Sequence, residues 1–216
     1  MKNFLVVANW KAHTMPWEIN GDFLVKVVIA CGYNYLAKIK DQKSNIFLCS
    51  QDISKYSNGS YTGEVTGEML KGIVEYCLVG HSERRRLFNE TNEDINEKIK
   101  HGHENNIIPI IFARNEKDLE GINLDKENDL LCYEPEEAIS RKGEYQQVNY
   151  DQLRTTLEQW QIKYGCKLLY GGSVNSENIG EIMKNGGELL NGVVVGKASL
   201  DKTSFTTIVE NIKNLI

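Results

Sequence analysis

Eight short apolar runs recur along the chain, and amphipathic segments lie between many of them. The runs are rich in Val, Ile and Leu and do not alternate with polar residues, which is typical of parallel strands covered on both faces. We expect strands at Phe4–Ala8, Val25–Ala30, Asn45–Ser50, Tyr76–Val79, Ile107–Phe112, Asp129–Tyr133, Cys166–Tyr170 and Gly192–Val195. The clearest helical patterns cover Glu64–Ile73, Asn92–Asn105, Asp151–Lys163, Ser176–Lys184 and Ser204–Leu215.

Eight strand–helix units in this order predict an α/β fold, namely a closed (β/α)8 barrel. An open doubly wound sheet is the alternative, but no G-x-G-x-x-G motif follows the first strand. The length of 216 residues fits one domain that spans residues 1–216. Barrels of this kind run to roughly 250 residues, so parts of the outer layer must be reduced.

The residues that this chain lacks relative to a barrel of ordinary length are expected to be missing from two connecting segments. Only thirteen residues separate Lys11 from Val25, and the segment Glu116–Asn128 between the fifth and sixth strands is equally short. Glycines in both segments favour turns over a packed helix. We therefore expect the first and fifth outer helices to be shortened to a turn or two, or missing.

Composition and charge exclude several classes of protein. The net charge of −5 argues against a nucleic-acid partner, and the basic cluster Arg84–Arg86 reads as the salt-bridged start of a helix. No apolar run is long enough to cross a membrane, and the amino end does not resemble a signal peptide. We therefore expect a cytoplasmic protein without a nucleic-acid or membrane partner.

The cysteines and histidines do not predict a metal site. The five cysteines are odd in number, contain no CxxC pair and lie in or beside apolar runs, as buried free thiols do. His101 and His103 are two residues apart on an expected helix, so they face different sides. We expect no metal.

Chemically useful residues follow several of the expected strands. In a closed parallel barrel all strand carboxyl ends lie on one face. Lys11 follows the first strand, His81 the fourth and Glu134 the sixth, and the glycine turns Gly171–Ser173 and Gly196–Lys197 follow the last two. A cation, a histidine, a carboxylate and two glycine turns are thus predicted to meet at one end of the barrel.

Each side chain has a functional and a structural interpretation. Glu134 precedes Pro135 and the polar segment Ser140–Gly143, which suits a base beneath a movable lid, although a solvated strand end has the same pattern. His81 begins a helix-like segment whose amino end would keep the ring neutral, or it is a structural cap. Lys11 can place a positive charge where an oxyanion forms, or it is simply solvated.

The two glycine turns lie where barrels of this kind usually hold a phosphate, through backbone N–H groups and a helix amino end. Either turn alone is equally explained as a tight turn. A base, a neutral acid and a cation around a small phosphorylated substrate suit proton abstraction next to a carbonyl group.

These motifs together resemble the triosephosphate isomerase family, over residues 3 to about 210. The matching motifs, in chain order, are Asn9–Lys11, Gln51–Ile53, Tyr61–Val65, Val79–Arg85, Tyr133–Pro135, Tyr170–Val174 and Val195–Leu200. The resemblance implies a TIM barrel that interconverts dihydroxyacetone phosphate and D-glyceraldehyde 3-phosphate, a reaction of glycolysis and gluconeogenesis. It implies neither a cofactor nor a metal.

The resemblance also implies roles for individual residues. Glu134 would move a proton between C1 and C2 through an enediolate, and His81 would polarise the carbonyl group and shuttle protons between the oxygens. Lys11 and Asn9 would stabilise the developing negative charge. Glu83 would position Lys11 or relay protons.

Further implied contacts concern the phosphate and a partner chain. The lid would be latched by Tyr170 and Ser173, and the segment 55–64 would join two copies into a homodimer, with Thr62 near the partner's Lys11. The phosphate would rest on backbone amides of Ser140, Ser173, Gly196 and Lys197.

The chain departs from the family pattern in four places. The fifth strand ends in Phe112–Asn115 instead of Cys-x-Gly-Glu, Glu136 and Glu137 follow Pro135, the lid tip reads Ser140–Gly143, and Lys197 replaces a glycine. These changes concern lid closure more than the type of reaction. Two alternatives stay open: an aldolase or epimerase, which would need a Schiff-base lysine or a metal cluster, and a barrel that binds triose phosphates or a protein without turnover.

Overall fold

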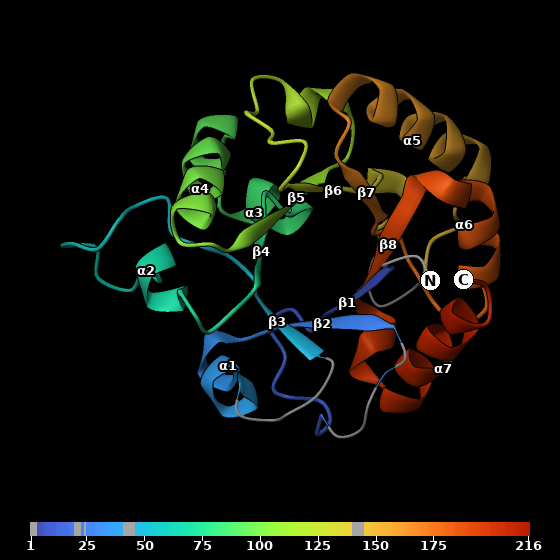
Figure 1. Cartoon of the computed structure of the whole chain (residues 1–216), viewed down its shortest axis with the longest axis horizontal. Coiled ribbons are helices and arrows are strands. Elements are labelled where there is room, and N and C mark those ends of the chain that lie inside the picture. The colour runs from blue at the N-terminus through green and yellow to red at the C-terminus, as the bar shows by residue number, and fades with distance from the viewer. Residues whose placement is uncertain (1–3, 20–22, 24, 41–45, 140–144) are drawn as a thin grey trace.

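The computed structural model describes residues 4–19, 23, 25–40, 46–139 and 145–216, and its eight parallel strands close into a barrel in chain order (Figure 1). The ring closes between the first and last strands, where Leu5 lies opposite Gly192. The strands are β1 (Leu5–Asn9), β2 (Lys26–Cys31), β3 (Ile46–Ser50), β4 (Tyr76–Val79), β5 (Ile108–Ala113), β6 (Leu130–Tyr133), β7 (Lys167–Tyr170) and β8 (Leu190–Val195). The predicted closed barrel is confirmed, and each strand ends within one residue of the expected position.

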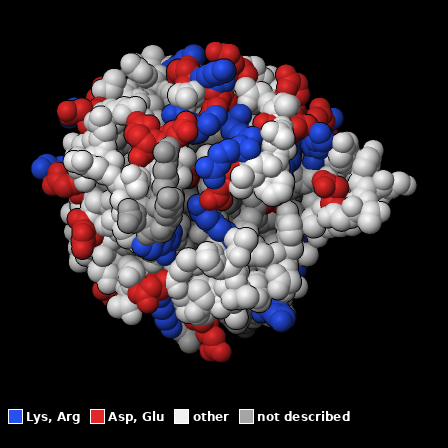
Figure 2. Space-filling model, turned by 180° about the vertical axis from the view of Figure 1, so that it is seen from behind, with Lys and Arg blue, Asp and Glu red and all other residues white. Residues whose placement is uncertain are grey.

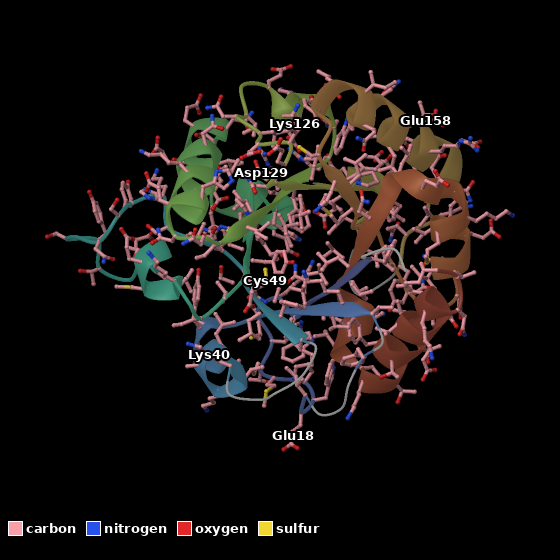
Figure 3. All side chains as sticks on the ribbon, viewed as in Figure 1. Glu18, Lys40, Cys49, Lys126, Asp129 and Glu158 are labelled. Atoms are coloured by element: carbon pink, nitrogen blue, oxygen red, sulfur yellow. The ribbon has the colours of Figure 1, made fainter. Side chains whose placement is uncertain are left out.

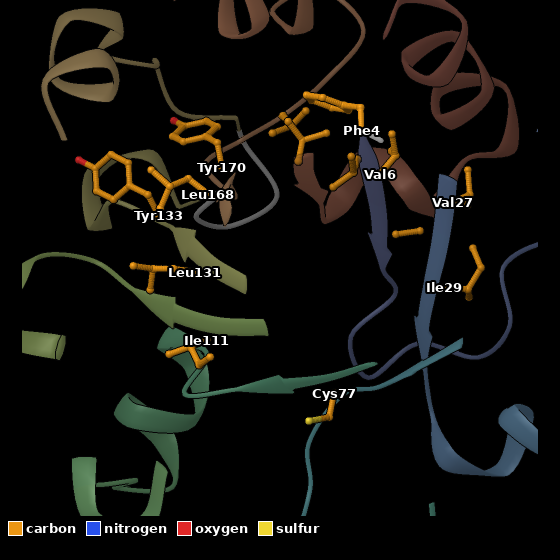
Figure 4. Packing of buried hydrophobic residues seen from close by; sticks show 14 of the residues in the cluster. Phe4, Val6, Val27, Ile29, Cys77, Ile111, Leu131, Tyr133, Leu168 and Tyr170 are labelled. Carbon is orange, nitrogen blue, oxygen red and sulfur yellow. The ribbon is translucent and has the colours of Figure 1, made fainter. Parts of the chain in front are cut away.

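Side chains alternate along each strand, so that one face fills the barrel and the other packs against the outer layer. The interior cluster consists of Leu5, Val7, Val28, Ala30, Cys49, Tyr76, Leu78, Ile110, Phe112, Leu130, Cys132, Leu169 and Val194. The larger cluster packs the opposite strand faces against the outer elements and includes Val6, Val27, Ile111 and Leu168 (Figure 4). Because the interior cluster fills the barrel, the mouth is formed by the residues that follow the strands.

A ring of helices surrounds the strands (Figure 1). Charged side chains such as Glu18, Lys40 and Glu158 point outward, whereas Cys49 lies buried inside (Figure 3). The described residues form α1 (Tyr33–Lys40), α2 (Gly67–Leu70), α3 (Ser82–Leu87), α4 (Asn92–Glu104), α5 (Tyr150–Tyr164), α6 (Ile179–Gly186) and α7 (Lys202–Lys213). They also form four 3₁₀ helices, η1 (Glu116–Leu119), η2 (Glu136–Ala138), η3 (Gly187–Leu189) and η4 (Lys197–Leu200).

Four of the five expected helices occur close to their predicted positions, and the first of the five in chain order does not. The pattern at Glu64–Ile73 becomes the single turn α2, because Thr66 caps it only at Gly67 and the backbone of Lys71 leaves the helical region. Neither α1 nor α3 was among the clearest sequence patterns. α3 carries the basic cluster Arg84–Arg86, and Arg84 pairs with Asp52 at 2.9 Å, in agreement with the predicted salt-bridged helix start.

The first outer helix is absent over residues 10–19, which run as turns and irregular backbone. This segment covers the barrel with Trp17 instead. The ring of Trp17 packs edge-on against Trp10 at 5.2 Å and lies 5.9 Å from Phe205 of α7. The indole N–H groups of Trp10 and Trp17 both donate to the backbone carbonyl of Ser199, at 3.1 and 2.9 Å. An aromatic segment fixed to η4 thus takes the place of a helix.

The fifth outer helix is reduced to η1, a 3₁₀ helix of 4 residues that Asn115 caps. Its carboxylate Asp118 accepts hydrogen bonds from the side chain and the backbone N–H of Arg114. The rest of the connection to β6 contains turns without a helix. The prediction of shortened or missing first and fifth helices therefore agrees with the described part of both segments.

We expect Trp17 to contribute measurably to stability. Trp17→Phe removes one indole hydrogen bond and should lower the free energy of unfolding by about 1 kcal/mol. Trp17→Ala also removes the packing and should cost roughly 2–4 kcal/mol. Urea unfolding followed by circular dichroism measures both values. As a control, Ile162→Ala on α5 changes a side chain that is 88% exposed and should stay within about 0.5 kcal/mol of wild type. Equal stability of all three variants would contradict this account.

Candidate active site

A cavity of about 340 Å³ opens at the carboxyl ends of the strands. It contains predicted site residues from both halves of the chain together with residues that the sequence did not single out. The lining consists of Asn9, Lys11, His13, His81, Glu134, Ile139, Tyr145, Gly171, Ser173, Val174, Val194, Gly196, Lys197 and Leu200. Figure 2, which views the barrel from the end opposite to that in Figure 1, shows Lys and Arg side chains around the hollow on this face.

The first strand end is held in an unusual backbone conformation. Lys11 has φ +48°, a left-handed conformation that is uncommon for a residue with a long side chain. Asn9 stabilises it, because the Asn9 Oδ1 accepts a hydrogen bond from the Lys11 N–H at 3.0 Å. Gln51, which follows β3, donates to the carbonyl oxygens of Lys11 at 2.9 Å and Ala30 at 3.0 Å. The site therefore begins with a strained residue that side-chain hydrogen bonds support.

His81 directly precedes α3 and caps its amino end. Its Nδ1 accepts a hydrogen bond from the backbone N–H of Glu83 at 3.3 Å. A ring nitrogen that accepts a hydrogen bond carries no proton, so the neutral ring holds its proton on Nε2. Nε2 lies 3.4 Å from Glu134 Oε1. The helix amino end thus presents a neutral imidazole that donates into the cavity.

Glu134 follows β6, on the face of the strand that carries Leu130 and Cys132 inside the barrel. It is only 5% exposed, and the Ser82 hydroxyl donates to its Oε2 at 2.7 Å. Burial alone would raise the pKa of Glu134. The His81 ring, the Ser82 hydroxyl and the Lys11 ammonium together hold that pKa below its ordinary value. A carboxylate is therefore ready in the cavity before any ligand enters.

Lys11 and Glu83 form an ion pair at the edge of the cavity. The Lys11 ammonium lies 2.6 Å from Glu83 Oε1, and both side chains are about one-third exposed. The second oxygen, Oε2 of Glu83, is 3.6 Å from His81 Nδ1. The predicted positioning of Lys11 by Glu83 therefore has a direct contact that supports it.

The two predicted phosphate turns lie side by side in the cavity wall. Ser173 has φ +44°, and its hydroxyl accepts a hydrogen bond from the Gln146 N–H at 3.0 Å. Gly196 lies next to the Lys11 side chain, because a Cβ atom at Gly196 would be 3.7 Å from Lys11 Cε. Lys197 opens η4 and also lines the cavity. Ser140, the fourth predicted phosphate contact, and the lid tip at 140–143 lie outside the described residues.

The predicted latch residue Tyr170 is buried at the end of β7. Its hydroxyl oxygen has no hydrogen-bond partner among the described residues. The hydroxyl and Ala138 of η2 both lie where a Cβ atom at Gly172 would stand, at 2.4 and 2.7 Å. Burial raises the pKa of Tyr170, so the hydroxyl keeps its proton and can donate. Its position at η2 agrees with the expected latch, whose function stays a prediction.

The sequence did not single out several residues of this site. Ser82 is the first residue of α3 and donates to Glu134, but α3 was too short to be recognised from its periodicity. Gln51 belongs to a recognised motif, but nothing in the sequence showed that it supports Lys11. His13 and Tyr145 come from irregular segments. The motif around His81 contains Ser82 and was the one available signal.

The described residues contain no group of three or more His, Cys, Asp or Glu side chains placed to hold a metal ion. All five cysteines are buried free thiols, as the sequence predicted. Within the same residues, no helix combines the length and apolar character needed to cross a membrane. What the cavity does offer is a buried carboxylate, a neutral imidazole donor and an ammonium group, a set suited to moving a proton beside a carbonyl group.

We expect Ser82→Ala to raise the pKa of Glu134. The Ser82 hydroxyl donates to the ionised form, and its loss removes a contact that favours that form. In a ¹³C NMR titration of the side-chain carboxyl groups, the Glu134 midpoint should lie below 4.5 in the wild type and move upward in Ser82→Ala. Asp201, whose pKa the backbone N–H and the hydroxyl of Ser204 hold below its ordinary value, serves as an internal control in the same samples and should not move. An unchanged Glu134 midpoint would contradict this account.

Comparisons with known proteins agree with the geometry. The family model described as triosephosphate isomerase matches residues 4–212. A triosephosphate isomerase of Alkaliphilus metalliredigens is 34% identical over 248 aligned positions, which cover 97% of this chain and 99% of that protein. A triosephosphate isomerase of Orientia tsutsugamushi is 32% identical, with 98% of each chain covered.

Both alignments have 248 positions, more than the 216 residues of this chain, so the chain lacks residues that these relatives contain. This difference agrees with the absence of a first outer helix over residues 10–19 and with the shortened fifth one. The matched region runs from β1 to α7 and includes every strand of the barrel. The chain belongs to the triosephosphate isomerase family.

Proposed function

We infer that this chain is an isomerase that interconverts dihydroxyacetone phosphate and D-glyceraldehyde 3-phosphate through an enediolate. One observation carries the mechanism: the Glu134 carboxylate is buried in the cavity, 3.4 Å from the proton-bearing Nε2 of a neutral His81. A base and a hydrogen-bond donor placed this close can act on neighbouring atoms of a small substrate. The family membership supports the same reaction.

The carbon-bound proton moves from C1 to Glu134 and then from Glu134 to C2, and His81 exchanges protons with the two oxygens in between. Glu134 takes a proton from C1 of dihydroxyacetone phosphate, and the electrons of that C–H bond form the C1–C2 double bond while the carbonyl oxygen gains charge. His81 donates its Nε2 proton to this oxygen and takes the proton of the C1 hydroxyl in return. Glu134 then gives its proton to C2, which yields D-glyceraldehyde 3-phosphate. Both residues end in their starting protonation states.

Lys11 and Asn9 stabilise the charge that develops on the oxygens. Both line the cavity that contains Glu134, and Asn9 is only 5% exposed. A fixed positive charge in a partly water-free site stabilises an oxyanion more strongly than it would in bulk water. Glu83 keeps the Lys11 ammonium in place. In this proposal Glu83 positions Lys11 and does not touch the substrate.

The phosphate of the substrate binds on the backbone amides of Ser173, Gly196 and Lys197, with Ser140 as an expected further contact. Tyr170 latches the lid when it closes. We place the reaction in the cytoplasm, and the proposal includes no cofactor, nucleic-acid partner or membrane. The small size of a triose phosphate fits a cavity of about 340 Å³.

We expect Glu134→Gln and Glu134→Asp to lose nearly all activity and keep the fold. The amide cannot accept the proton, and the aspartate withdraws the base by about one C–C bond. Either change should lower kcat by two orders of magnitude or more. A coupled assay of D-glyceraldehyde 3-phosphate isomerisation measures this, with circular dichroism as the test of folding. Full activity in a folded Glu134→Gln protein would overturn the mechanism.

The same assay separates the alternatives. An aldolase or epimerase would not interconvert the two triose phosphates, and a barrel that only binds them would bind without turnover. Wild-type protein that binds a triose phosphate but shows no isomerisation would favour the binding protein. We expect turnover, because the base and the donor lie side by side in the cavity.

We also propose that two copies of the chain form a homodimer through residues 55–64. This segment extends away from the barrel in Figure 1, between β3 and α2. Its aromatic side chains are partly exposed and already ordered: the rings of Tyr56 and Tyr61 stack at 4.1 Å with an interplanar angle of 5°. A preformed apolar projection suits insertion into a second copy at low cost in entropy. Thr62 would then approach the partner's Lys11.

We expect sedimentation of a dimer at micromolar concentration. Tyr61→Asp places a charge in the projected interface and should give a monomer with much lower activity, because Lys11 loses its support from the second copy. Ile162→Asp changes an exposed apolar residue on α5, outside the segment 55–64, and should remain dimeric and active. A wild-type monomer with full activity would contradict the proposal.

A further inference from the structure

Lys197 stands at the start of η4, directly after Gly196. Its backbone does not need glycine, because the non-glycine residues with positive φ are Lys11, Asn89, Asn106 and Ser173. A lysine therefore fits the turn without backbone strain. The side chain is the feature that remains to be explained.

The Lys197 ammonium lies over an aromatic ring that also lines the cavity. Its Nζ lies 4.7 Å from the centre of the Tyr145 ring, within the range of a cation–π contact. Both residues line the same cavity as Glu134 and His81. Tyr145 is itself held beside the β7 turn, because the next residue, Gln146, donates its N–H to Ser173 Oγ at 3.0 Å. The aromatic ring thus fixes the ammonium at the wall formed by Ser173 and Gly196.

The charges that line the cavity indicate what the Lys197 ammonium can bind. A phosphate dianion that enters the site meets the ionised Glu134, whose charge repels it. The Lys11 ammonium is already paired with Glu83 at 2.6 Å, so much of its charge is compensated. Backbone amides supply only partial charges. Lys197 lines the same cavity as Ser173 and Gly196, and a second ammonium group there adds to the attraction for the phosphate.

We propose that the Lys197 ammonium, positioned by the Tyr145 ring, binds the phosphate group of the substrate directly. This inference rests on the proposed isomerase function for the identity of the substrate, but it concerns phosphate binding, which can be measured without turnover. On binding, Nζ moves from the ring face to the phosphate oxygens, and the ring stays beside it. Lys197 is then a binding residue and has no part in the proton transfer.

Isothermal titration with inorganic phosphate and steady-state kinetics together test the proposal. Lys197→Met keeps the length of the side chain and removes the charge. It should weaken phosphate binding about tenfold and raise KM for D-glyceraldehyde 3-phosphate similarly, while kcat changes less than about twofold. Raising the salt concentration should weaken phosphate binding less in this variant than in wild type.

Three further variants define the contact. Lys197→Arg keeps the charge and the contact with the ring and should bind phosphate within about threefold of wild type. Tyr145→Leu keeps the ammonium but loses its platform and should weaken binding less than Lys197→Met does. Lys184→Met removes an exposed lysine of α6 that pairs with Glu181, and it should change neither phosphate binding nor KM.

The outcomes separate this inference from the proposed function. Phosphate binding and KM that match wild type in Lys197→Met would overturn the inference, even if isomerase activity is high. A loss of kcat with unchanged phosphate binding would overturn it as well. Wild-type protein without isomerase activity, whose phosphate binding still falls in Lys197→Met, would support the inference while the proposed function fails.

Discussion

The hydrogen-bonded ring of eight parallel strands determines where every other group in this protein stands. Closure fixes the strands relative to one another, and the alternation of side chains fixes which residues face inward. Leu130 and Cys132 point into the barrel, so Glu134, two residues further on, reaches the mouth on the same face. Leu5 and Val7 place Asn9 in the same way. The cavity is thus the continuation of the barrel interior, with polar groups where the apolar layers end.

The reduced outer layer connects stability to the site. Residues 10–19, which form no helix, cover the barrel through Trp10 and Trp17, and both indoles bind the carbonyl group of Ser199. Ser199 belongs to η4, the 3₁₀ helix that begins at Lys197. The segment that carries Lys11 and the turn proposed to bind phosphate are therefore held to each other. In this shortened barrel, a contact that replaces an outer helix also fixes the distance between two parts of the cavity.

Sequence patterns predicted the barrel, its strand ends and the residues that meet there, because each depends on local periodicity and on one rule of topology. They failed where the answer depends on tertiary contacts. α3 has only 6 residues, too few to show a repeating helical pattern, so the contact between Ser82 and Glu134 could not be foreseen. The pattern at 64–73 suggested a full helix, but Thr66 and Lys71 confine it to one turn. The stacking of Lys197 on Tyr145 joins η4 to an irregular segment far away in the sequence.

Backbone strain in the described residues is concentrated at the cavity. Of the four non-glycine residues with positive φ, Asn89 and Asn106 are of a type that tolerates this conformation. The other two, Lys11 and Ser173, both line the cavity. Such a conformation costs on the order of 1–3 kcal/mol and persists only where neighbouring contacts impose it.

Those contacts are present for both residues. Asn9 and Gln51 bind the backbone of Lys11, and Gln146 and Asn178 bind Ser173 through its hydroxyl and its carbonyl group. With this backbone conformation, the Lys11 side chain lies against Glu83 and Gly196 at the mouth of the barrel. An extended backbone at Lys11 would direct the side chain elsewhere. The strained backbone thus lowers the stability of the folded protein before the substrate binds. In return, the ammonium needs little reorganisation when negative charge develops on the substrate.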